Sequence, residues 1–322
     1  MTQITFNDQL FESQLGESVL NTLLRHNQSI PYGCKAGVCQ SCLMCCLDDV
    51  PSLASAQVGL TDTQQKQQYF LSCLCLPEKA MSVALPTTSQ TWLDAKVVDK
   101  RPLSSNVIQL TLQTNEPLPF LAGQFVNLRN KAGVIRSYSI ANPPNAQHTL
   151  VFHIRVLPHG QFTRWLSDAL EVGMTLDVSP AQGGCHYIKG NPEQSLLLIG
   201  TGTGLAPLYG ILCDALDNHQ HQGDIHLFHG SRNATGLYFE DTLSELAQKH
   251  SNFHYTPCLS EKNSEAPYAQ GRANTIALQQ FSQLAGWRVY LCGQADMVAQ
   301  TKKMAYLQGA SLKAIYADAF SS

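Results

Sequence analysis

The chain has 322 residues, of which 44% are hydrophobic and 14% charged, and its formal net charge is −3. This length predicts two or three domains, and the weak charge excludes a basic field for nucleic acid or an anionic membrane. No apolar run is long enough to span a bilayer, and the N-terminus lacks the basic and apolar regions of a signal peptide. We therefore expect a cytoplasmic, monomeric protein that binds neither nucleic acid nor a membrane.

The first segment, about 1–88, begins with two short alternating runs that predict a β-hairpin. Apolar residues at helical spacing then predict a helix over Ser18–His26. A cysteine-rich loop extends from Pro31 to Cys42. The two arms of the expected hairpin are Gln3–Phe6 and Gln9–Ser13. Two later strands are expected over Phe70–Leu76 and Met81–Leu85.

A short polar linker over 86–91 leads to a segment of short strands separated by turn signals, about 92–190. Such spacing predicts an antiparallel barrel or sandwich, and one helix, about Gln161–Ala169, interrupts it. The expected strands are Ala95–Asp99, Asn106–Gln113, Gln124–Arg129, Ser137–Ala141, Thr149–Val156 and Thr175–Ser179.

From Ser195 onward, strands alternate with helices, which predicts a doubly wound parallel α/β domain over 191–322. The expected helices are Pro207–Leu216 and Glu240–Lys249. The expected strands are Ser195–Ile199, Asp224–His229, Phe253–Leu259, Arg288–Cys292 and Ala314–Tyr316.

The chemistry of the first segment lies in its cysteines, because a protein with eleven cysteines in a reducing compartment uses them for metal binding or as free thiols. Three of them have C-x4-C-x2-C spacing and a fourth follows about thirty residues later, which is the plant-type 2Fe–2S pattern. Gly33 and Gly37 permit the tight curl that brings the sulfurs together. Ala36 allows backbone N–H groups to approach them. The expected ligands are Cys34, Cys39 and Cys42, together with one cysteine of the later pair Cys73 and Cys75.

Other metal and redox sites fit the cysteines less well. A bacterial 4Fe–4S run would need a cysteine followed by proline at Asp49 and Val50. A zinc site would prefer two separated CxxC pairs, and the later pair here is CxC. A redox disulfide would need a helix start after Cys42, where Leu43–Leu47 is strand-like.

The fourth ligand is open between Cys73 and Cys75, because both would face the same side of an extended strand. The runs PYGCKAGVCQSC and FLSCLCLP resemble plant-type ferredoxins, in which the last ligand matches the cysteine of the Leu-Ser-Cys step. The resemblance implies a β-grasp ferredoxin-like fold and assigns the ligand role to Cys73. Lys35 and Gln40 stand where many members have Arg and Gly. The resemblance leaves Cys45, Cys46 and Cys75 as core residues.

The second segment contains the short motif Arg136-Ser-Tyr-Ser139, which follows Gly123-Gln-Phe-Val126 and precedes His159-Gly-Gln-Phe-Thr163 at a helix start. An arginine can pair with a phosphate, and a helix N-terminus offers an anion site. The tetrapeptide alone would equally suit an ordinary strand. Together these motifs resemble the FAD-binding six-stranded barrel of the ferredoxin–NADP reductase superfamily.

The resemblance implies a role for each motif residue. Arg136 would meet the FAD pyrophosphate, Tyr138 the flavin or ribityl region, and Ser139 the ring. The helix start would help to bind phosphate, and the next strand would line the site; these residues are Gly160, Gln161, Phe162, Thr163, His153 and Ile154.

In the third segment, a buried strand at Leu196 leads into a glycine-rich turn and a helix. Glycines there allow the backbone to approach a pyrophosphate, although the spacing is neither GxGxxG nor a P-loop. A plain glycine turn that packs helix on strand is the alternative. The same superfamily binds NAD(P) at this turn, which implies contacts from Gly200, Thr201, Gly202, Thr203 and Gly204.

The superfamily's later Cys-Gly element is matched by Cys292 and Gly293, with Gln294 where proline is usual. Cys292 would lie beside the nicotinamide and flavin and share the catalytic role with Ser139. Arg232 follows the second strand near the expected ribose, but it does not decide between NADH and NADPH; the resemblance slightly favours NADH. Phe320 resembles a C-terminal ring near the flavin, and a terminal anchor is the other interpretation.

Ferredoxin, FAD barrel and NAD(P) domain in this order resemble reductase components of bacterial multicomponent oxygenases and of deoxysugar dehydrases. The resemblance implies an oxidoreductase that passes electrons from NAD(P)H through FAD and the 2Fe–2S cluster, one at a time, to a protein acceptor. The first 88 residues have seven acidic and four basic residues, which predicts docking to a basic patch. The alternatives are a broad-acceptor flavin or quinone reductase and a redox sensor.

Overall fold

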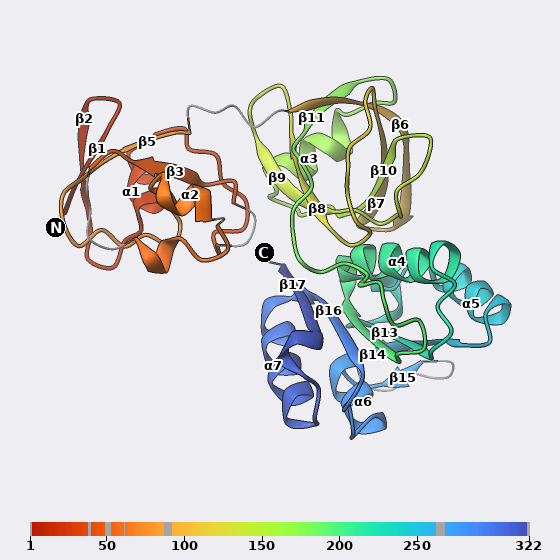
Figure 1. The fold of residues 1–322 in the computed structure, drawn as a ribbon. Coiled ribbons are helices and arrows are strands. Elements are labelled where there is room, and N and C mark those ends of the chain that lie inside the picture. Colours follow the sequence, from red (N-terminus) through yellow and green to blue (C-terminus); the bar gives the residue numbers. More distant parts are fainter. Residues whose placement is uncertain are drawn as a thin grey trace. The chain divides into compact units, whose positions relative to one another are not determined.

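A computed structural model describes residues 2–37, 40–48, 53–60, 62–86, 92–261 and 268–320 (Figure 1). By backbone proximity the chain forms two compact units. One unit is Met1–Trp92 with Asn127–Ser137, and the other is Leu93–Val126 with Tyr138–Ser322. Most of the barrel and the whole α/β segment thus share one unit. The three boundaries 1–88, 92–190 and 191–322 stay a prediction.

The N-terminal segment contains a mixed five-stranded sheet in the order β2-β1-β5-β3-β4. β1 pairs antiparallel with β2 and parallel with β5, which is the β-grasp arrangement. The apolar helix face of α1 is buried in the same core as the sheet. The elements are β1 Thr2–Phe6, β2 Gln9–Ser13, α1 Val19–Arg25, β3 Leu43–Cys46, α2 Asp62–Lys66, β4 Tyr69–Leu71 and β5 Met81–Ala84.

The expected hairpin and first helix are both present. Ser18 begins the helix as a cap, because its hydroxyl accepts a hydrogen bond from the Asn21 backbone N–H at 3.2 Å. The strand expected over Phe70–Leu76 is wrong beyond Leu71, where the chain turns and Cys75 N–H donates to the Leu71 carbonyl. Cys73 and Cys75 therefore do not share the face of an extended strand.

The second segment forms a six-stranded antiparallel barrel in the order β10-β7-β6-β11-β8-β9. A bridge between Ile140 and Phe152 joins the end of β9 to β10 and closes it. β6 is longer than expected, and Pro102 lies at one of its two bulges, where a missing N–H is tolerated. The elements are β6 Leu93–Ser104, β7 Val107–Thr114, β8 Phe125–Arg129, β9 Ile135–Ser139, β10 Thr149–Arg155, α3 Gln161–Asp168 and β11 Thr175–Val178.

The third segment is a parallel six-stranded sheet in the order β15-β14-β13-β12-β16-β17. The expected alternation is present, and the structure adds two helices and a short strand that the pattern did not predict, α6, α7 and β15. The elements are β12 Leu196–Thr201, α4 Leu205–Cys213, β13 Ile225–Ser231, α5 Glu240–Lys249, β14 Phe253–Leu259, β15 Ala269–Gln270, α6 Ala273–Gln280, β16 Arg288–Gln294, α7 Ala295–Leu307 and β17 Ile315–Phe320.

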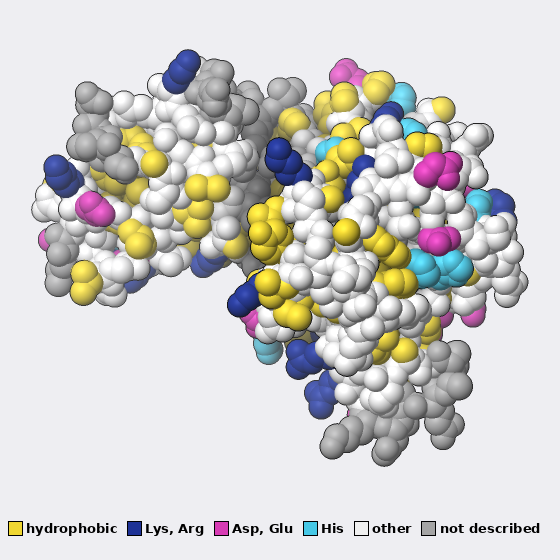
Figure 2. Space-filling model, turned by 60° about the horizontal axis from the view of Figure 1, so that its bottom comes forward, with side chains coloured by type: hydrophobic (Ala, Val, Ile, Leu, Met, Phe, Trp, Pro, Cys, Tyr) yellow, Lys and Arg dark blue, Asp and Glu magenta, His cyan; other side chains and the backbone are white. Residues whose placement is uncertain are grey.

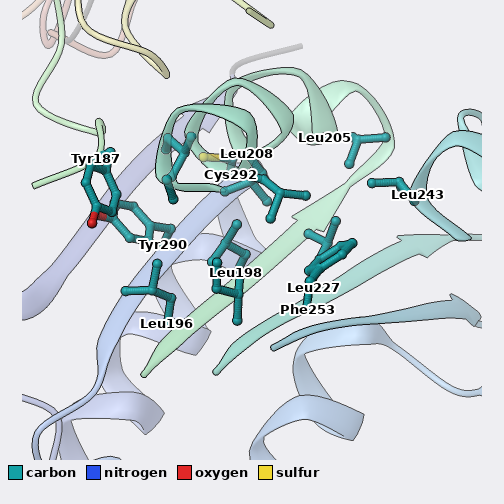
Figure 3. Close-up of a cluster of buried hydrophobic side chains, with 14 of the residues drawn as sticks. Tyr187, Leu196, Leu198, Leu205, Leu208, Leu227, Leu243, Phe253, Tyr290 and Cys292 are labelled. Atoms are coloured by element: carbon teal, nitrogen blue, oxygen red, sulfur yellow. The ribbon is translucent and has the colours of Figure 1, made fainter. Parts of the chain in front are cut away.

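Helices cover both faces of this parallel sheet, as in a doubly wound fold. Leu196 and Leu198 point toward α4 and α5, where they pack with Leu208 and Leu243 (Figure 3). The alternate residues, such as Leu197, belong to the core beneath α6 and α7. Burial on both faces explains why β12 is an unbroken apolar run.

The surface carries few charges for its size. On the face drawn in Figure 2, hydrophobic side chains form small groups among uncharged surface, with isolated Lys, Arg, Asp and Glu side chains. Within the described ranges, no helix is both long enough and apolar enough to cross a membrane.

Candidate functional site: a cysteine loop and a buried interdomain junction

Three of the four expected cluster ligands can be located, whereas Cys39 lies outside the described residues. The Cys73 sulfur is hydrogen-bonded with Cys42, and this contact, with burial and the nearby charge of Cys34, raises the pKa of the Cys73 thiol. Thiolates brought this close need a positive partner, and an iron–sulfur cluster supplies one. The ten described cysteines form no disulfide.

Backbone N–H groups point at two of these sulfurs. Ala36 N–H donates to Cys34 Sγ at 3.3 Å, and Gly37 N–H donates to the Cys73 sulfur. A Cβ on Gly37 would overlap the Leu74 side chain, so the loop needs glycine there. Gln40 adopts a left-handed φ of 53°, a conformation that glycine adopts more readily. The loop fits a sulfur cluster of the expected kind.

Cys75 has different surroundings from Cys73. Its side chain is buried in the domain core, and burial together with nearby Cys46 raises the pKa of its thiol to about 12. Within the described ranges, no trio of histidine, cysteine or acidic side chains is already in metal-binding geometry. The motif is incomplete there because Cys39 lies outside those ranges. The surroundings favour Cys73 as the fourth ligand, which stays a prediction.

The expected flavin residues of the barrel lie along β9 and its neighbours. Arg136 is half-buried and donates from Nη1 to the Ile135 carbonyl at 2.7 Å. The Tyr138 ring is half-buried and tilts against Phe162, with ring centroids 5.7 Å apart. The side chain of Ile154 is completely buried in the barrel. β9 thus presents Arg136 and Tyr138 at partly open positions that suit a ligand.

The start of α3 forms a closed turn. Gly160 is its N-terminal cap, and the Thr163 hydroxyl accepts from Leu157 N–H at 3.1 Å while it donates to the Gly160 carbonyl at 3.3 Å. Phe162 is fully buried. The side chain of Thr163 therefore shapes the turn, so that a phosphate would be bound by the helix N–H groups, including that of Gln161.

The glycine turn after β12 is in direct contact with the end of β16. A Cβ on Gly204 would overlap the Cys292 carbonyl, and a Cβ on Gly293 would overlap the Thr201 hydroxyl. By contrast, a Cβ on Gly202 would meet no atom within 4 Å. The turn is therefore tightly held on its inner side and open where a pyrophosphate would approach. Thr203 lies between Gly202 and Gly204 in this turn.

Asp318 links the two expected catalytic residues, Ser139 and Cys292. Ser139 Oγ donates to Asp318 Oδ2 at 3.1 Å, although the two are 179 residues apart. Asp318 lies directly opposite Cys292 in the β16–β17 ladder. All three side chains are buried, and burial raises the pKa of the Asp318 carboxyl to about 6, which the hydrogen bond from Ser139 partly offsets.

A second thiol lies beside Cys292. Cys185 Sγ is 3.6 Å from Cys292 Sγ, within thiol hydrogen-bonding distance, and both residues are buried. Burial, then this contact, raises the pKa of the Cys292 thiol well above its ordinary value. Cys292 is therefore a neutral thiol and not a nucleophilic thiolate.

His153 lies against the nucleotide domain. Its Nδ1 is 3.2 Å from the Tyr238 hydroxyl, and its ring centroid is 4.8 Å from that of Phe239. Burial lowers the pKa of His153 to about 3, so the ring is neutral. Arg232 is exposed after β13, and its carbonyl accepts from Glu261 N–H. Phe320 is half-buried at the end of β17.

Sequence reasoning missed Asp318 and Cys185. A signal for Asp318 existed, since it is a single acidic residue between two alanines in a strand that otherwise carries apolar residues. Cys185 follows two glycines in an irregular stretch and carries no such signal. Both are recognised only from what they touch.

Comparison with known protein families assigns the three segments. Residues 4–78 match a 2Fe–2S iron–sulfur cluster binding domain, 94–187 an oxidoreductase FAD-binding domain, and 198–303 an oxidoreductase NAD-binding domain. Each of the three segments is thus similar to a different cofactor-binding domain. The chain thus combines 2Fe–2S, FAD and NAD domains in one oxidoreductase, as the resemblance implied.

Several relatives match the chain over nearly its whole length. The chain is 26% identical to the xylene/toluene monooxygenase electron transfer component XylA of Pseudomonas putida, over 96% of this chain and 90% of that one. It is 29% identical to the reductase subunit of an Amycolatopsis aromatic O-demethylase, over 95% and 94%. The structure matches the crystal structure of the Amycolatopsis cytochrome P450 reductase GcoB with a TM-score of 0.71 and 27% identity, covering 100% of this chain and 99% of that one.

Proposed function

We propose that this three-domain reductase takes electrons from NAD(P)H at the buried junction and delivers them singly, through the cysteine loop, to an acceptor protein. When bound, FAD accepts a two-electron hydride from the nicotinamide, and the 2Fe–2S cluster carries the electrons onward one at a time. The observation that carries this proposal is the meeting of Ser139, Asp318 and Cys292, which joins the flavin barrel to the nucleotide domain.

Ser139 and Asp318 hold the reacting groups in place. The ionised Asp318 carboxylate accepts a hydrogen bond from the Ser139 hydroxyl, which fixes the rotamer of that hydroxyl and would leave its lone pairs available to a bound flavin. Cys292 presents a neutral thiol, in contact with Cys185, which would add bulk without charge beside a bound nicotinamide. Their burial excludes water, and this protects a hydride in transfer from protonation.

The remaining contacts bind and orient the two nucleotides. Arg136 and the N-terminal N–H groups of α3 suit the FAD pyrophosphate, because both offer donors to an anion. The open side of the turn at Gly202 suits the NAD(P)H pyrophosphate. Cys34 and Cys73 are partly exposed, so a cluster held there lies close enough to the surface to serve a docked protein.

The acceptor that we propose is the terminal component of an oxygenase or a similar system. The relatives named above are components of monooxygenase, demethylase and P450 systems, and they match this chain over nearly its full length. The acidic excess of residues 1–88 suggests a basic docking face on that acceptor. Acceptor reduction should then slow as ionic strength rises, and a rate independent of salt would count against this docking mode.

The test is an anaerobic stopped-flow experiment on the full-length holoprotein mixed with NADH or NADPH. We expect flavin bleaching first, cluster bleaching second, and then rapid one-electron reduction of cytochrome c as a model acceptor. Acceptor reduction that bypasses the cluster would indicate a broad-acceptor flavin or quinone reductase. Bleaching without steady turnover would indicate a redox sensor.

A further inference from the structure

The fully buried His229 contacts the backbone of the glycine turn that follows β12. His229 lies on β13, directly opposite Gly200 of β12 in the parallel ladder, and its side chain is completely inaccessible to solvent. Its Nε2 is 3.1 Å from the carbonyl oxygen of Gly202. None of the contacts described for hydride transfer involves this residue.

The contact fixes the state of the imidazole. A carbonyl oxygen can only accept a hydrogen bond, so Nε2 must carry the proton and Nδ1 must be the unprotonated nitrogen. Within the described part of the chain Nδ1 has no hydrogen-bond partner. Burial lowers the pKa of His229 to about 4, so the ring is neutral at physiological pH. Among the residues that the structure describes, the Gly202 carbonyl is the one polar partner of this ring.

The Gly202 carbonyl is the atom whose direction decides whether the turn can bind an anion. It accepts from His229 and also from the Leu205 backbone N–H, so it points into the protein. Gly202 has a left-handed φ of 53°, and no side chain of its own restrains the following peptide. If that peptide rotated, the carbonyl would face the pyrophosphate and the Thr203 N–H would turn inward, which would replace a donor by a repelling acceptor.

The turn cannot move without disturbing the junction. The Thr201 hydroxyl accepts from Gln294 N–H at 3.2 Å, and Gly204 lies against the Cys292 carbonyl. His229 is itself held by Tyr238, whose ring meets it edge-on at a centroid distance of 5.6 Å. The Tyr238 hydroxyl pairs in turn with His153 of the barrel. The imidazole is therefore fixed on both sides.

We propose that His229 is a positioning residue for the nicotinamide nucleotide, because it locks the Gly202–Thr203 peptide with its N–H toward the pyrophosphate. This inference rests on the proposed binding of NAD(P)H at the glycine turn. It requires a donor at the place of Nε2 and not merely a side chain that fills the space. Its effect falls on nucleotide binding and not on the hydride-transfer step.

The test uses variants that separate the donor from the volume of the ring. His229→Gln retains an N–H donor at about the reach of Nε2, His229→Asn is shorter by one methylene group, and His229→Phe retains the ring without the donor. His226→Phe is the matched control, because it lies on the same strand and stacks on His254, away from the turn. NAD⁺ binding to the oxidised holoprotein is measured by calorimetry, alongside KM and kcat for NADH.

We expect His229→Asn and His229→Phe to raise both the NAD⁺ Kd and the NADH KM about tenfold, the cost of one buried hydrogen bond, with kcat unchanged. His229→Gln and His226→Phe should bind NAD⁺ as the unchanged protein does. An unchanged Kd in His229→Asn would overturn the inference, and so would a loss in His229→Gln as large as in His229→Asn.

Folding failure and failure of the wider proposal give different results. If His229→Phe loses its flavin absorbance, the Asn and Gln variants still decide, since both are polar amides of similar volume. Loss of flavin and cluster in both amide variants would show a purely structural role and would overturn the inference. If the unchanged protein itself bound no NAD⁺ and oxidised no NAD(P)H, the proposed function would fail, whatever the variants did.

Discussion

The cysteine loop and the buried junction solve opposite problems. Cys34 on the cysteine loop and Cys73 in the turn after β4 are both partly exposed, and backbone N–H groups face their sulfurs. Ser139 and Cys292, in contrast, are buried at the ends of strands from two different domains. Single electrons can leave from a site close to the surface, whereas a hydride needs a dry site in which the donor and acceptor cannot shift. The solvent exposure of each site therefore matches its reaction: the cysteines for single-electron transfer are partly exposed, and the residues for hydride transfer are buried.

The strongest test of this comparison separates the two regions. Cys73→Ser should remove the cluster absorbance and abolish cytochrome c reduction, because the Cys73 sulfur is the one in contact with Cys42. NADH-dependent ferricyanide reduction at the flavin should survive. Absorbance spectra and the two steady-state rates measure the outcome.

Cys75→Ser is the matched control for that variant. Its thiol is buried in the domain core, so the change should lower the free energy of unfolding by about 1–3 kcal/mol and leave the cluster spectrum intact. If Cys73→Ser kept a normal cluster spectrum while Cys75→Ser lost it, the ligand assignment would be reversed.

Ser139→Ala should have the next largest effect and should be confined to the junction. Removal of the hydroxyl held by Asp318 should slow flavin reduction by NADH on the order of 10²-fold, while the cluster spectrum is unchanged. Ser137→Ala on the same strand is the control, since that hydroxyl donates to Asn127 Oδ1 at 2.7 Å. Equal rate losses in both variants would remove the special role of Ser139.

Asp318→Asn should change the pH dependence of the same step. The folded-state pKa of Asp318 is raised from 3.8 to about 6, so flavin reduction should slow as the pH falls below about 6, when protonation weakens the acceptor for Ser139. The asparagine variant should be slower at pH 8 and should lack this inflection. Stopped-flow rates between pH 5 and 8 give the profile.

The same shift has a consequence for stability. A raised pKa means that the protonated form is favoured in the folded state, so stability is lost as the pH rises from about 4 through about 6. Asp318→Asn should therefore gain up to about 3 kcal/mol relative to the unchanged protein between pH 4 and 7. A constant difference across this range would show that the carboxylate is better solvated than its burial indicates.

Arg232→Ala should have the smallest effect, because its side chain is exposed after β13. If Arg232 meets a 2′-phosphate, the KM for NADPH should rise by less than about tenfold and the KM for NADH should not change. Lys249→Ala at the end of α5 removes the same charge as a control. Equal KM changes for both nucleotides would exclude contact with a 2′-phosphate.

The local patterns predicted most of the fold and the presence of a 2Fe–2S domain, whereas the individual cluster ligands stay a prediction. Cys34 and Cys42 act within one loop, so their spacing in the sequence carries the geometry. The all-apolar run at Leu196 predicts a strand covered on both faces, and the sheet confirms it. The helices α6 and α7 were missed because their apolar residues are spread too evenly for a clear helical stripe.

Tertiary structure alone decided the junction. Ser139 and Asp318 are 179 residues apart, and Cys185 and Cys292 are 107 apart, so no spacing rule connects either pair. The turn after Leu71 likewise gave Cys73 and Cys75 different surroundings, which an extended strand would not have done. The cofactor domains and their order could be predicted from the sequence, because each domain carries its own local motif. Which buried groups meet depends on packing between distant strands, and only the folded chain determines it.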